Sequence, residues 1–585
     1  MKKGFLWLFM LLALGCSSSS NDKDTTASQD LDSMDVSTLP EVLDITEGLT
    51  EDITLPDEIT TETVDDIAPD LDVMNLDTAD MTDSTDVVID MGPLPFSEGP
   101  YGTKPYQIAD DFTLPTLDGD WNFKEHWSGG NDSYVFLFWA NGNEYINQIW
   151  NSDPKYLFKN SPLNVHYFFL SYEDTAEADV EALRERVYAS LDELGLGLDV
   201  HFKARTHFVT ATAHQMGNWV SDVVMSTGYF SLAIDRFQRL RETGLLADVA
   251  GGGSGNIRYL RYAAEYFNYE WERERDLQQE DEEEAVTQVP VFTDDYFANE
   301  KFVDVEFPDA AAMAQFDTME IDFRMGCDTE YDESCGEWDY LAHLHLCDPA
   351  NTDQCPTEVG RWITAYSRPG HWVTDISSLL PLFQDGGIFR FKMNNSWQSY
   401  RNDMVFRLSN RGKDSKPAQL IPLWTQGGWF NLDYNPAHEP INVDIPAAAK
   451  RVEIVAYITG HGFAWDKANC SEFCNHQHRF TVGGDSYMKE FPYAGTNTGC
   501  AAEVGAGVVP NQFGTWPLGR GGWCPGLDVK PWVADITASV TPGSAATISY
   551  EGLYKGEPYD PVEADNNDGA TPGNIVLTTY LAIWE

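Results

Sequence analysis

The chain has 585 residues, more than one compact domain normally holds, so three or four structural units are expected. Its formal net charge of −57 argues against binding to nucleic acid or to anionic lipid headgroups, because like charges repel. Aromatic residues make up 13% of the chain, which is ample material for buried cores and for stacking surfaces.

Residues 1–16, MKKGFLWLFMLLALGC, place two lysines before an apolar run that is too short to span a bilayer. This arrangement predicts an export signal. The end of the run resembles a bacterial lipobox, in which the cysteine becomes the lipidated first residue of the mature protein. We therefore expect an exported lipoprotein with a lipid on Cys16, and the serines that follow favour the outer membrane or the cell surface. The alternative is an ordinary signal peptide that contains a cysteine.

Residues 17–95 contain no aromatic residue, and from Asp22 to Asp90 there are 22 acidic residues against one lysine. Such a segment cannot bury enough apolar surface to offset the entropy lost on ordering. Its charges repel one another and extend it. The composition predicts a disordered acidic tether.

Residues 96–285 have the pattern of an α/β domain. Apolar runs at 134–140 and 165–172 predict buried strands. Asp174 to Glu177 then have the spacing of a helix capping box. Five apolar residues follow at helical spacing: Val180, Leu183, Val187, Leu191 and Leu194. The alternation of strand and helix predicts a sheet covered by helices.

Two segments of this domain resemble the thioredoxin and peroxiredoxin family. DFTLPTLDG, residues 111–119, is similar to the opening strand and turn of that family, and FLFWA, residues 136–140, to the strand before its redox loop. Where the family carries Cys-x-x-Cys, this chain has residues 143–146, NEYI, and residues 100–290 contain no cysteine. Thiol exchange requires a thiolate, so we expect a thioredoxin-like scaffold or partner-binding module without redox chemistry.

The pattern changes after residue 285. Residues 257–276 predict an aromatic-rich helix, and residues 278–288, QQEDEEEAVTQ, predict an exposed acidic linker at a domain boundary. Beyond it, short alternating segments such as 301–307 and 451–458 are separated by glycine and proline turns. This pattern predicts two antiparallel sandwiches or jelly rolls.

Eight further cysteines all lie beyond residue 326 of a chain that is predicted to be exported, so disulfides are the default expectation. Pairing each cysteine with its neighbour would give four bridges, although the sequence leaves other pairings open. The eight are Cys327, Cys335, Cys347, Cys355, Cys470, Cys474, Cys500 and Cys524.

Residues 334–343, SCGEWDYLAH, place two carboxylates beside a tryptophan at the entrance of a predicted strand. Alternation along the strand puts Asp339, His343 and His345 on the face opposite the apolar one. Asp339 would then point toward a groove as a candidate catalytic acid or base, whereas a turn or cap role is the alternative. Glu337 is interpreted as a peripheral residue at the disulfide-anchored entrance.

Four segments in order resemble the bacterial peptide-N-glycosidase F family. They are the Cys-x-Glu-Trp-Asp motif at 335–339, the segment GRWITAYS at 360–367, the Cys-x-Glu-Phe-Cys motif at 470–474, and RGGWCPG at 520–526. The resemblance covers roughly residues 289–585. It implies an all-β module of two eight-stranded antiparallel jelly rolls that are packed side by side with the site between them.

The resemblance also implies an activity, namely hydrolysis of the amide that joins an asparagine side chain to the first N-acetylglucosamine of an N-glycan. The asparagine becomes aspartate, no cofactor is used, and the substrates are N-linked glycoproteins or glycopeptides. By motif, Asp339 and Glu472 match the catalytic carboxylates and Arg520 the site arginine. Tyr366, Trp397 and Trp523 match residues that line the pocket for the sugar core.

The chain departs from the family pattern at three positions. Asn395 stands in place of a third acidic residue, and an amide can form hydrogen bonds but cannot accept a proton as a base. Tyr340 stands in place of an arginine, and His461 in place of a pocket tryptophan. These departures leave a second hypothesis, a glycan-binding surface lipoprotein with weak or no turnover.

A third hypothesis is a metal protein. His343-x-His345 and His476-x-His478 are same-face pairs if they lie on strands, and copper monooxygenases have a similar double jelly roll. The methionines nearby, Met393 and Met404, have no spacing that indicates a metal site.

The predicted domain organisation has five parts. They are a signal peptide, a tether, a thioredoxin-like domain and two jelly rolls, at residues 1–16, 17–95, 96–285, 286–415 and 416–585.

Overall fold

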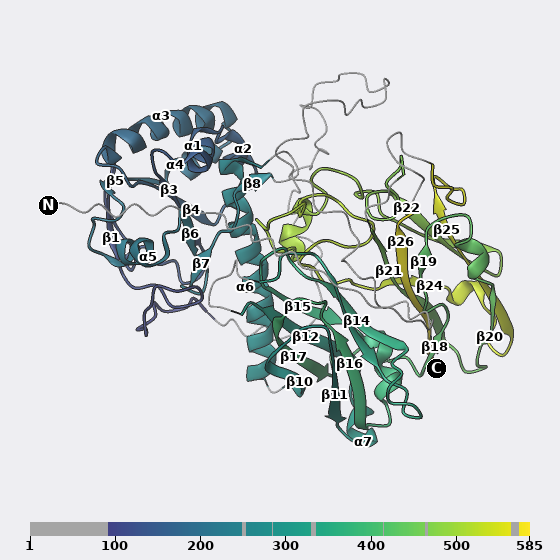
Figure 1. Cartoon of the computed structure of the whole chain (residues 1–585). Helices are drawn as coiled ribbons and strands as arrows, with labels where there is room; N and C mark the ends of the chain where they lie inside the picture. The colour runs from purple at the N-terminus through teal and green to yellow at the C-terminus, as the bar shows by residue number, and fades with distance from the viewer. Residues whose placement is uncertain are drawn as a thin grey trace, which may run out of the picture. The chain divides into compact units, whose positions relative to one another are not determined.

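The computed structural model describes residues 92–585 except 249–252, 284, 329–334, 414, 463–465 and 563–571. These residues belong to one compact unit, Val88–Glu585, which is shown in Figure 1. The predicted export signal, the lipidation of Cys16 and nearly all of the predicted tether lie outside the described residues. Within the described ranges, no helix is both long and apolar enough to cross a membrane.

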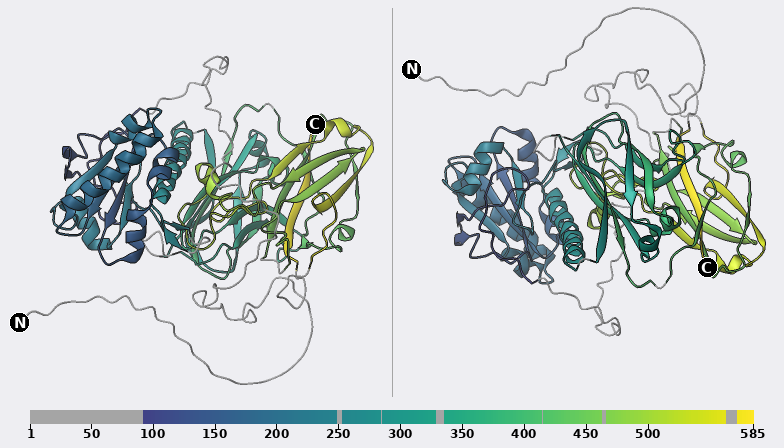
Figure 2. Two further views of the ribbon diagram at one scale, coloured as in Figure 1. Left: turned by 90° about the horizontal axis from the view of Figure 1, so that it is seen from above. Right: turned by 90° about the horizontal axis from the view of Figure 1, so that it is seen from below.

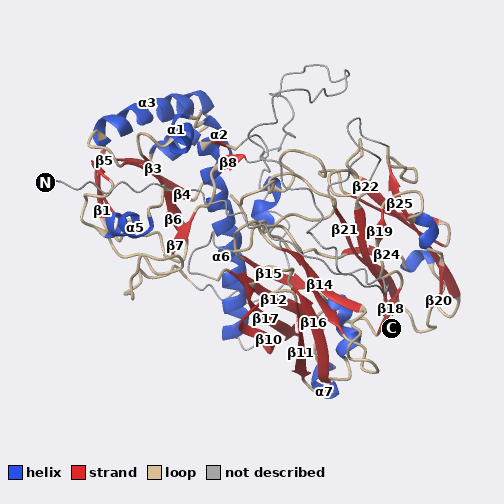
Figure 3. Ribbon diagram, viewed as in Figure 1, coloured by secondary structure: helices blue, strands red, loops and turns tan. Residues whose placement is uncertain are grey.

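The first part of the described chain is an α/β layer structure with helices on both faces of one sheet (Figure 3). The sheet has the order β2-β1-β5-β4-β3-β6-β7, and β3, β4 and β5 pair in parallel. Its strands are β1 (Thr113–Thr116), β2 (Gly119–Asn122), β3 (Ser133–Trp139), β4 (Val165–Ser171), β5 (Thr206–Thr212), β6 (Ser231–Ile234) and β7 (Leu240–Glu242). The predicted α/β character and both predicted buried strands are confirmed.

The central strands are apolar on both faces because helices cover each side. Val135 and Leu137 pack into one core, and Phe136 and Phe138 into the other. The helices are α1 (Glu144–Asn151), α2 (Lys155–Asn160), α3 (Ala176–Leu194), α4 (Leu198–Lys203), α5 (Trp219–Thr227) and α6 (Leu260–Glu282), with a 3₁₀ turn η2 (Ile257–Tyr259) and a small hairpin of β8 (Ala247–Asp248) and β9 (Ser254–Gly255).

Helix α3 confirms the predicted apolar spacing but not the predicted capping box. Its first four periodic residues are fully buried. The helix begins one residue later than the box requires, with Thr175 as the N-cap residue. The Thr175 hydroxyl donates to Asp179 (3.0 Å) instead of capping a backbone N–H. The prediction of a box starting at Asp174 is therefore wrong, because the N-cap residue is Thr175 and its side chain caps no backbone N–H.

The predicted acidic linker is also wrong for most of its length. Helix α6 continues through Glu282, and its acidic end contacts arginines that lie about 130 residues later. Glu280 bonds both Arg407 (2.9 Å) and Arg411 (2.5 Å), and Asp281 bonds Arg407 (3.1 Å). These arginines offset the repulsion among the acidic side chains, on which the prediction of a linker rested. Figure 2 shows α6 from two sides between the seven-stranded sheet and the strands that follow it.

Two four-stranded antiparallel sheets form the first sandwich, with orders β10-β17-β12-β15 and β11-β16-β13-β14. Its strands are β10 (Val286–Phe297), β11 (Glu300–Phe307), β12 (Thr318–Gly326), β13 (Leu341–Leu346), β14 (Thr357–Ile363), β15 (Gly370–Asp375), β16 (Gly387–Asn394) and β17 (Tyr400–Ser409). Short helical segments α7 (Ala310–Met313) and η3 (Ser377–Phe383) connect them. The predicted eight-stranded sandwich is confirmed here.

The second sandwich has sheets of order β18-β26-β21-β24, with β19 added to β26, and β20-β25-β22-β23. Among its described residues it therefore has nine strands rather than the expected eight, because the two-residue β19 pairs with the start of β26. The strands are β18 (Gln419–Pro422), β19 (Gly428–Trp429), β20 (Ile441–Asp444), β21 (Arg451–His461), β22 (His476–Val482), β23 (Asp485–Glu490), β24 (Trp532–Asp535), β25 (Ala545–Tyr554) and β26 (Asn574–Trp584); the 3₁₀ segments are η4 (Asn435–Ala437), η5 (Ala501–Ala506) and η6 (Thr537–Ser539).

A buried ion pair on β14 joins the two sandwiches. Arg361 binds Glu358 through two bonds of 2.7 Å and also donates to the Thr459 hydroxyl of β21 (2.7 Å). From β26, the hydroxyls of Thr578 and Tyr580 donate to Glu358 at 2.5 and 2.8 Å. Apolar side chains of β21 and β26 complete the core of the first sandwich. The loops at the ends of both sandwiches are thus held in a fixed relation.

The four disulfides join neighbouring cysteines, as the simplest pairing predicts. They are Cys327–Cys335, Cys347–Cys355, Cys470–Cys474 and Cys500–Cys524. The first closes the loop before β13, the third closes the loop before β22, and the fourth closes the long loop between β23 and β24. Three of the four bridges therefore hold loops that carry predicted site residues.

Candidate functional site

Arg520 joins carboxylates that come from the two sandwiches. Its Nη2 lies 3.3 Å from Asp339 Oδ2, in the loop before β13, and its Nε lies 3.2 Å from Glu472 Oε1, in the disulfide loop before β22. The guanidinium is fully buried, while the side chains of Asp339 and Glu472 keep 16% and 13% exposure. Three residues that lie far apart in the sequence thus form one site whose carboxylates are largely buried but keep a small exposed fraction.

The remaining N–H groups of Arg520 are also committed to protein acceptors. Nη1 donates to the backbone carbonyls of Thr515 (3.0 Å) and Leu518 (2.9 Å), and Nη2 donates to the Thr515 hydroxyl (2.7 Å) and to the Tyr366 hydroxyl (3.3 Å). A guanidinium has five N–H donors. With all three nitrogens donating to protein groups, the arrangement fits an orienting role.

The loop that carries Asp339 is held by the chain just after β14. Thr364 accepts the backbone N–H of Tyr340 (2.7 Å) and donates to the carbonyl of Trp338 (2.6 Å), so it binds on both sides of Asp339. Strand β13 begins only at Leu341, so Asp339 lies in the entrance loop and not on the strand face that alternation suggested. Glu337, exposed in the same loop, is peripheral as interpreted.

Close backbone contacts bring the Glu472 and Arg520 loops together. The N–H of Gly521 donates to the Glu472 carbonyl (2.7 Å), and the N–H of Gly460 donates to the Gly521 carbonyl (2.7 Å). A Cβ at Gly521 would lie 2.2 Å from His476 Nε2 and 2.4 Å from the Ser471 carbonyl. Only glycine allows this approach, which explains the residue type after Arg520 in the motif.

Burial shifts the acid–base properties of both carboxylates. It raises the pKa of Glu472 to about 7, with the negative charge of Asp339 adding to the shift and Arg520 opposing it. Burial also raises the pKa of Asp339, against the charge of Arg520 and a hydrogen bond from Tyr366. One guanidinium offsets one negative charge, so the second carboxyl group of such a pair keeps its proton to higher pH.

Sequence reasoning missed Asn511 and Gln512, which connect the site to the α/β part. Asn511 Nδ2 donates to the carbonyls of Thr243 (2.7 Å) and Tyr259 (3.1 Å). Gln512 Oε1 accepts the backbone N–H of Tyr366 (2.8 Å), whose hydroxyl contacts Arg520. Neither residue belongs to a motif, and only their contacts across the fold reveal them.

Trp523 and His461 pack beside Arg520. The rings of His461 and Trp523 stack at 4.9 Å, and the Arg520 guanidinium lies 4.8 Å from the Trp523 ring centroid. Trp523 is only 6% exposed, and its Nε1 donates to the Gly460 carbonyl (2.6 Å). The structure thus places Trp523 as support for Arg520, and its contact with a sugar stays a prediction.

Trp397 and Tyr340 form an aromatic pair next to Asp339. Trp397 is 56% exposed, and its Nε1 donates to the Tyr340 hydroxyl (2.8 Å). Asn395, two residues earlier, is fully buried, and its amide donates to the Phe297 carbonyl (3.3 Å). The structure gives no bond between Asn395 and either Asp339 or Arg520 among the described residues, so it brings Trp397 but not Asn395 to the site.

Other exposed aromatic side chains lie on the same loops. Trp338 precedes Asp339, and Phe513 follows Gln512. The backbone carbonyl of Tyr493 packs against Gly519, the residue before Arg520, so closely that a Cβ at Gly519 would clash with it. Exposed rings are unusual enough around a polar site to indicate contact with a ligand that has apolar faces.

The two histidine pairs have partners inside the protein. His476 and His478 are buried with ring nitrogens 2.6 Å apart, and His478 also bonds the Tyr550 hydroxyl (2.7 Å). His343 and His345 stack at 5.5 Å, and His343 lies 3.0 Å from Glu358. Within the described part of the chain, no group of three or more His, Cys, Asp or Glu side chains is arranged to hold a metal ion.

Comparison with known proteins matches this region to one family. The family model for the C-terminal part of peptide-N-glycosidase F matches residues 430–582, which include Glu472, Arg520 and Trp523. The resemblance to peptide-N-glycosidase F is confirmed. The match covers the second sandwich, where two of the four sequence motifs lie.

A curated relative extends the likeness of the chain to peptide-N-glycosidase F. It is the peptide-N(4)-(N-acetyl-beta-D-glucosaminyl)asparagine amidase F of Elizabethkingia miricola, 24% identical over 246 residues. The match spans 38% of this chain and 64% of the relative, just under two thirds of its length.

Two solved structures also show similarity to the chain. One is PNGase F, a glycosylasparaginase from Flavobacterium meningosepticum, at 17% identity and a TM-score of 0.40, covering 51% of this chain and 95% of that one. Another is PNGF-II, at 11% identity and a TM-score of 0.39, covering 52% and 67%.

Proposed function

We propose that the chain is a peptide-N-glycosidase that hydrolyses the β-aspartylglucosylamine bond of N-linked glycoproteins or glycopeptides. The observation that carries this proposal is the pair of partly exposed carboxylates, Asp339 and Glu472, joined by the buried Arg520. The similarity to peptide-N-glycosidase F supports the same reaction. A water adds to the side-chain amide carbonyl, the C–N bond breaks, and the products are aspartate and a glycosylamine.

Asp339 is the proposed general base, and Glu472 the proposed acid. An aspartic acid ionises more readily than a glutamic acid, so with one guanidinium available Asp339 takes the negative charge first. Asp339 then accepts the proton of the attacking water. Glu472, with a pKa raised to about 7, keeps a proton that it can donate to the leaving nitrogen or to a sugar hydroxyl.

Arg520 acts in this proposal as a positioning residue. Its Nε, Nη1 and Nη2 all donate to protein acceptors, which leaves it suited to fixing the two carboxylates rather than to binding a developing oxyanion. The planar guanidinium donates one bond to each acid, from Nε to Glu472 and from Nη2 to Asp339, and so sets the orientation of both at once.

The aromatic side chains supply the proposed sugar contacts. The exposed Trp397 and Trp338 flank Asp339, and apolar faces of sugars pack on such rings. The rival function, glycan binding without turnover, rested on Asn395 replacing a site acid. Its amide bonds the Phe297 carbonyl instead of Asp339 or Arg520, so the observed contacts favour the enzyme.

The test is incubation of a denatured N-glycoprotein with the wild type and with Asp339→Asn. We expect release of intact glycan and conversion of asparagine to aspartate by the wild type, detected as a mass gain of about one unit at each site, and at least a 100-fold slower reaction with the variant. Equal rates would remove Asp339 from the mechanism. Retained glycan binding without any release by the wild type would establish the rival function.

Three assignments outside the site complete the proposal. The α/β part is proposed to be a thioredoxin-like scaffold, since Asn143 to Ile146 replace the redox motif at the start of α1. The domains are proposed to follow the boundaries at 95, 285 and 415.

The chain is also proposed to be an exported lipoprotein of the outer membrane or cell surface. Labelling of cells with a fatty-acid analogue tests this, and Cys16→Ser should abolish the label.

A further inference from the structure

A cavity of about 370 Å³ lies between α6, β7, β15 and the loop after β14, away from Asp339 and Glu472. Six arginines line it, and three carboxylates, from Glu270, Glu274 and Asp403. The arginines are Arg239, Arg241, Arg273, Arg324, Arg368 and Arg401. Lysine and arginine number only 37 against 94 acidic residues in the chain, so this concentration of positive charge runs against the composition.

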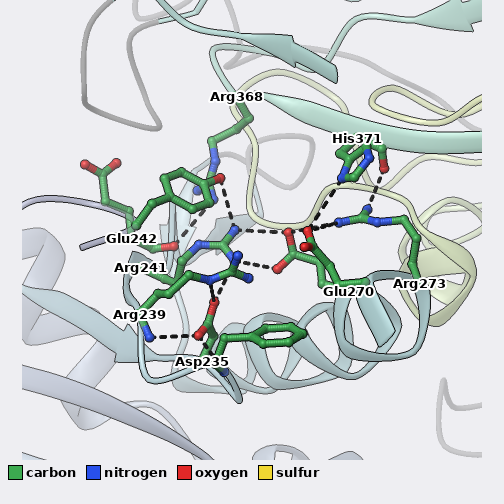
Figure 4. A network of polar contacts seen from close by, with 11 residues as sticks. Asp235, Arg239, Arg241, Glu242, Glu270, Arg273, Arg368 and His371 are labelled. Carbon is green, nitrogen blue, oxygen red and sulfur yellow. Dashed lines mark hydrogen bonds and ion pairs between the residues drawn. The ribbon is translucent and has the colours of Figure 1, made fainter. Parts of the chain in front are cut away.

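Four of the six arginines are balanced by carboxylates, as Figure 4 shows for the centre of the cluster. Arg241 contacts Glu270 (2.5 Å) and Asp235 (3.3 Å), and Arg239 contacts Asp235 (2.8 Å). Arg273 pairs with Glu274 (3.2 Å). Arg401, at the far wall, pairs with Asp294 (3.0 Å).

Arg324 and Arg368 have no carboxylate within 4 Å among the residues that the structure describes, although the charge of Arg324 acts on Glu274 and Asp322 from farther away. Arg368 is 5% exposed and donates one hydrogen bond, from Nη2 to the Glu242 carbonyl (3.4 Å). Its Nε and Nη1 are buried without a hydrogen-bond partner in the described structure. A buried guanidinium without an anion is costly, whereas a bound anion would offset that cost.

We infer that this cavity is a binding site for a small organic oxyanion, a carboxylate or phosphate ester of about monosaccharide size. The guanidinium of Arg368, with Arg324 at the entrance, would hold the anionic group, because arginine forms paired bonds to carboxylate and phosphate oxygens. The volume is at the lower end of small-molecule sites, roughly 300–1000 Å³, and it exceeds what an inorganic ion fills. The inference does not rest on the proposed glycosidase activity.

The experiment is calorimetric titration of the full chain with glucose 6-phosphate, with glucuronate and, as the neutral control, with glucose. We expect saturable binding of at least one acid and none of glucose, and the acid that binds identifies the anionic group. Arg368→Gln should weaken binding at least tenfold, and Arg368→Lys should restore part of it. Arg479→Gln, which breaks a partly exposed pair with Glu551 on the second sandwich, should change the affinity less than twofold.

Arg324→Gln serves as a second variant if Arg368→Gln does not fold, because Arg324 is exposed and its replacement leaves no buried gap. It should weaken binding at least threefold while circular dichroism stays unchanged. The inference is overturned if neither acid binds, if the arginine variants bind as tightly as the wild type, or if inorganic phosphate alone binds as tightly as the sugar phosphate.

Discussion

Gln512 accepts the backbone N–H of Tyr366 at 2.8 Å, although 146 residues separate them in the chain. The residue before it, Asn511, donates to Thr243 and Tyr259 of the α/β part. Two consecutive side chains therefore tie the α/β part to the residue that contacts Arg520. One apolar core also includes both the helices of that part and the side chains of Tyr366 and Trp516. The α/β part thus supports the site loops directly.

Asn511→Ala should destabilise the protein by about 3 kcal/mol, because two buried carbonyls lose their donor and alanine disfavours the positive φ of 53°. Activity per folded molecule should also fall, since the Gln512 loop loses its anchor. Urea unfolding and glycan-release rates measure the two effects. Asn410→Ala, which removes two hydrogen bonds from an exposed side chain, is the matched control and should cost less than about 1 kcal/mol.

Arg520→Lys should lower kcat about 100-fold with little change in KM, because one ammonium cannot hold both carboxylates in the geometry that the guanidinium sets. Steady-state kinetics on a glycopeptide separate the two constants. A purely structural role would lower the amount of folded protein and leave kcat per active site unchanged. Arg479→Lys, at an exposed pair, provides the control.

Glu472→Gln tests the raised pKa through stability. The folded state holds the Glu472 proton up to about pH 7, whereas the unfolded chain releases it near pH 4.5. Unfolding between these values releases a proton, so the wild type loses stability as pH rises through this window, by about 3 kcal/mol in total. Glutamine mimics the protonated form, so the variant should be more stable than the wild type at pH 8 and equally stable at pH 4. Equal stability at both pH values would contradict the shift.

The same variant has a kinetic consequence. If Glu472 acts as an acid, the wild-type rate should fall as pH rises above about 7, and the rate should also fall at low pH, where Asp339 takes up its proton. Glu472→Gln should be slow and should lack the basic limb. A basic limb that persists in the variant would assign it to another group.

The motifs predicted the site because they carry its residues on disulfide-anchored or glycine-rich segments. Cys470 and Cys474 frame Glu472, and Gly521 permits the close approach beside Arg520. Asn511 and Gln512 could not be predicted in this way, because their partners are distant in sequence and nothing near them marks a contact. The same reason explains why the acidic end of α6 was predicted to be a linker. Its partner Arg407, which offsets the negative charge of Glu280, is distant in the sequence.

Burial was the other property that sequence did not reveal. Trp523 and Trp397 were both expected to line a sugar pocket, yet the first is 6% and the second 56% exposed. A tryptophan beside a buried arginine and an exposed one in the loop between β16 and β17 carry the same sequence signal. The structure separates them, because Trp523 packs against His461 and Arg520 and bonds the Gly460 carbonyl.

Trp397→Ala should raise KM for a glycopeptide roughly five-fold with kcat nearly unchanged, since a ring contact contributes about 1 kcal/mol. Its exposure means that the fold should tolerate the change. Trp429→Ala, an exposed tryptophan on β19, is the control and should leave KM unaltered. A large fall in kcat for Trp397→Ala would instead place the ring in the positioning of Asp339.

Glu358→Gln tests the joint between the sandwiches. Burial opposes the charge of Glu358, but Arg361 and His343 hold its pKa well below the usual range, so the carboxylate stabilises the fold at neutral pH. The variant leaves Arg361 buried and unpaired, which should cost about 3–5 kcal/mol. Adding Arg361→Met should recover part of that loss, because the unpaired charge is gone. Glu551→Gln, at an exposed pair, should change the free energy of unfolding by less than about 1 kcal/mol. If the double variant is no more stable than Glu358→Gln alone, the cost lies in the lost contacts to Thr578 and not in the unpaired arginine.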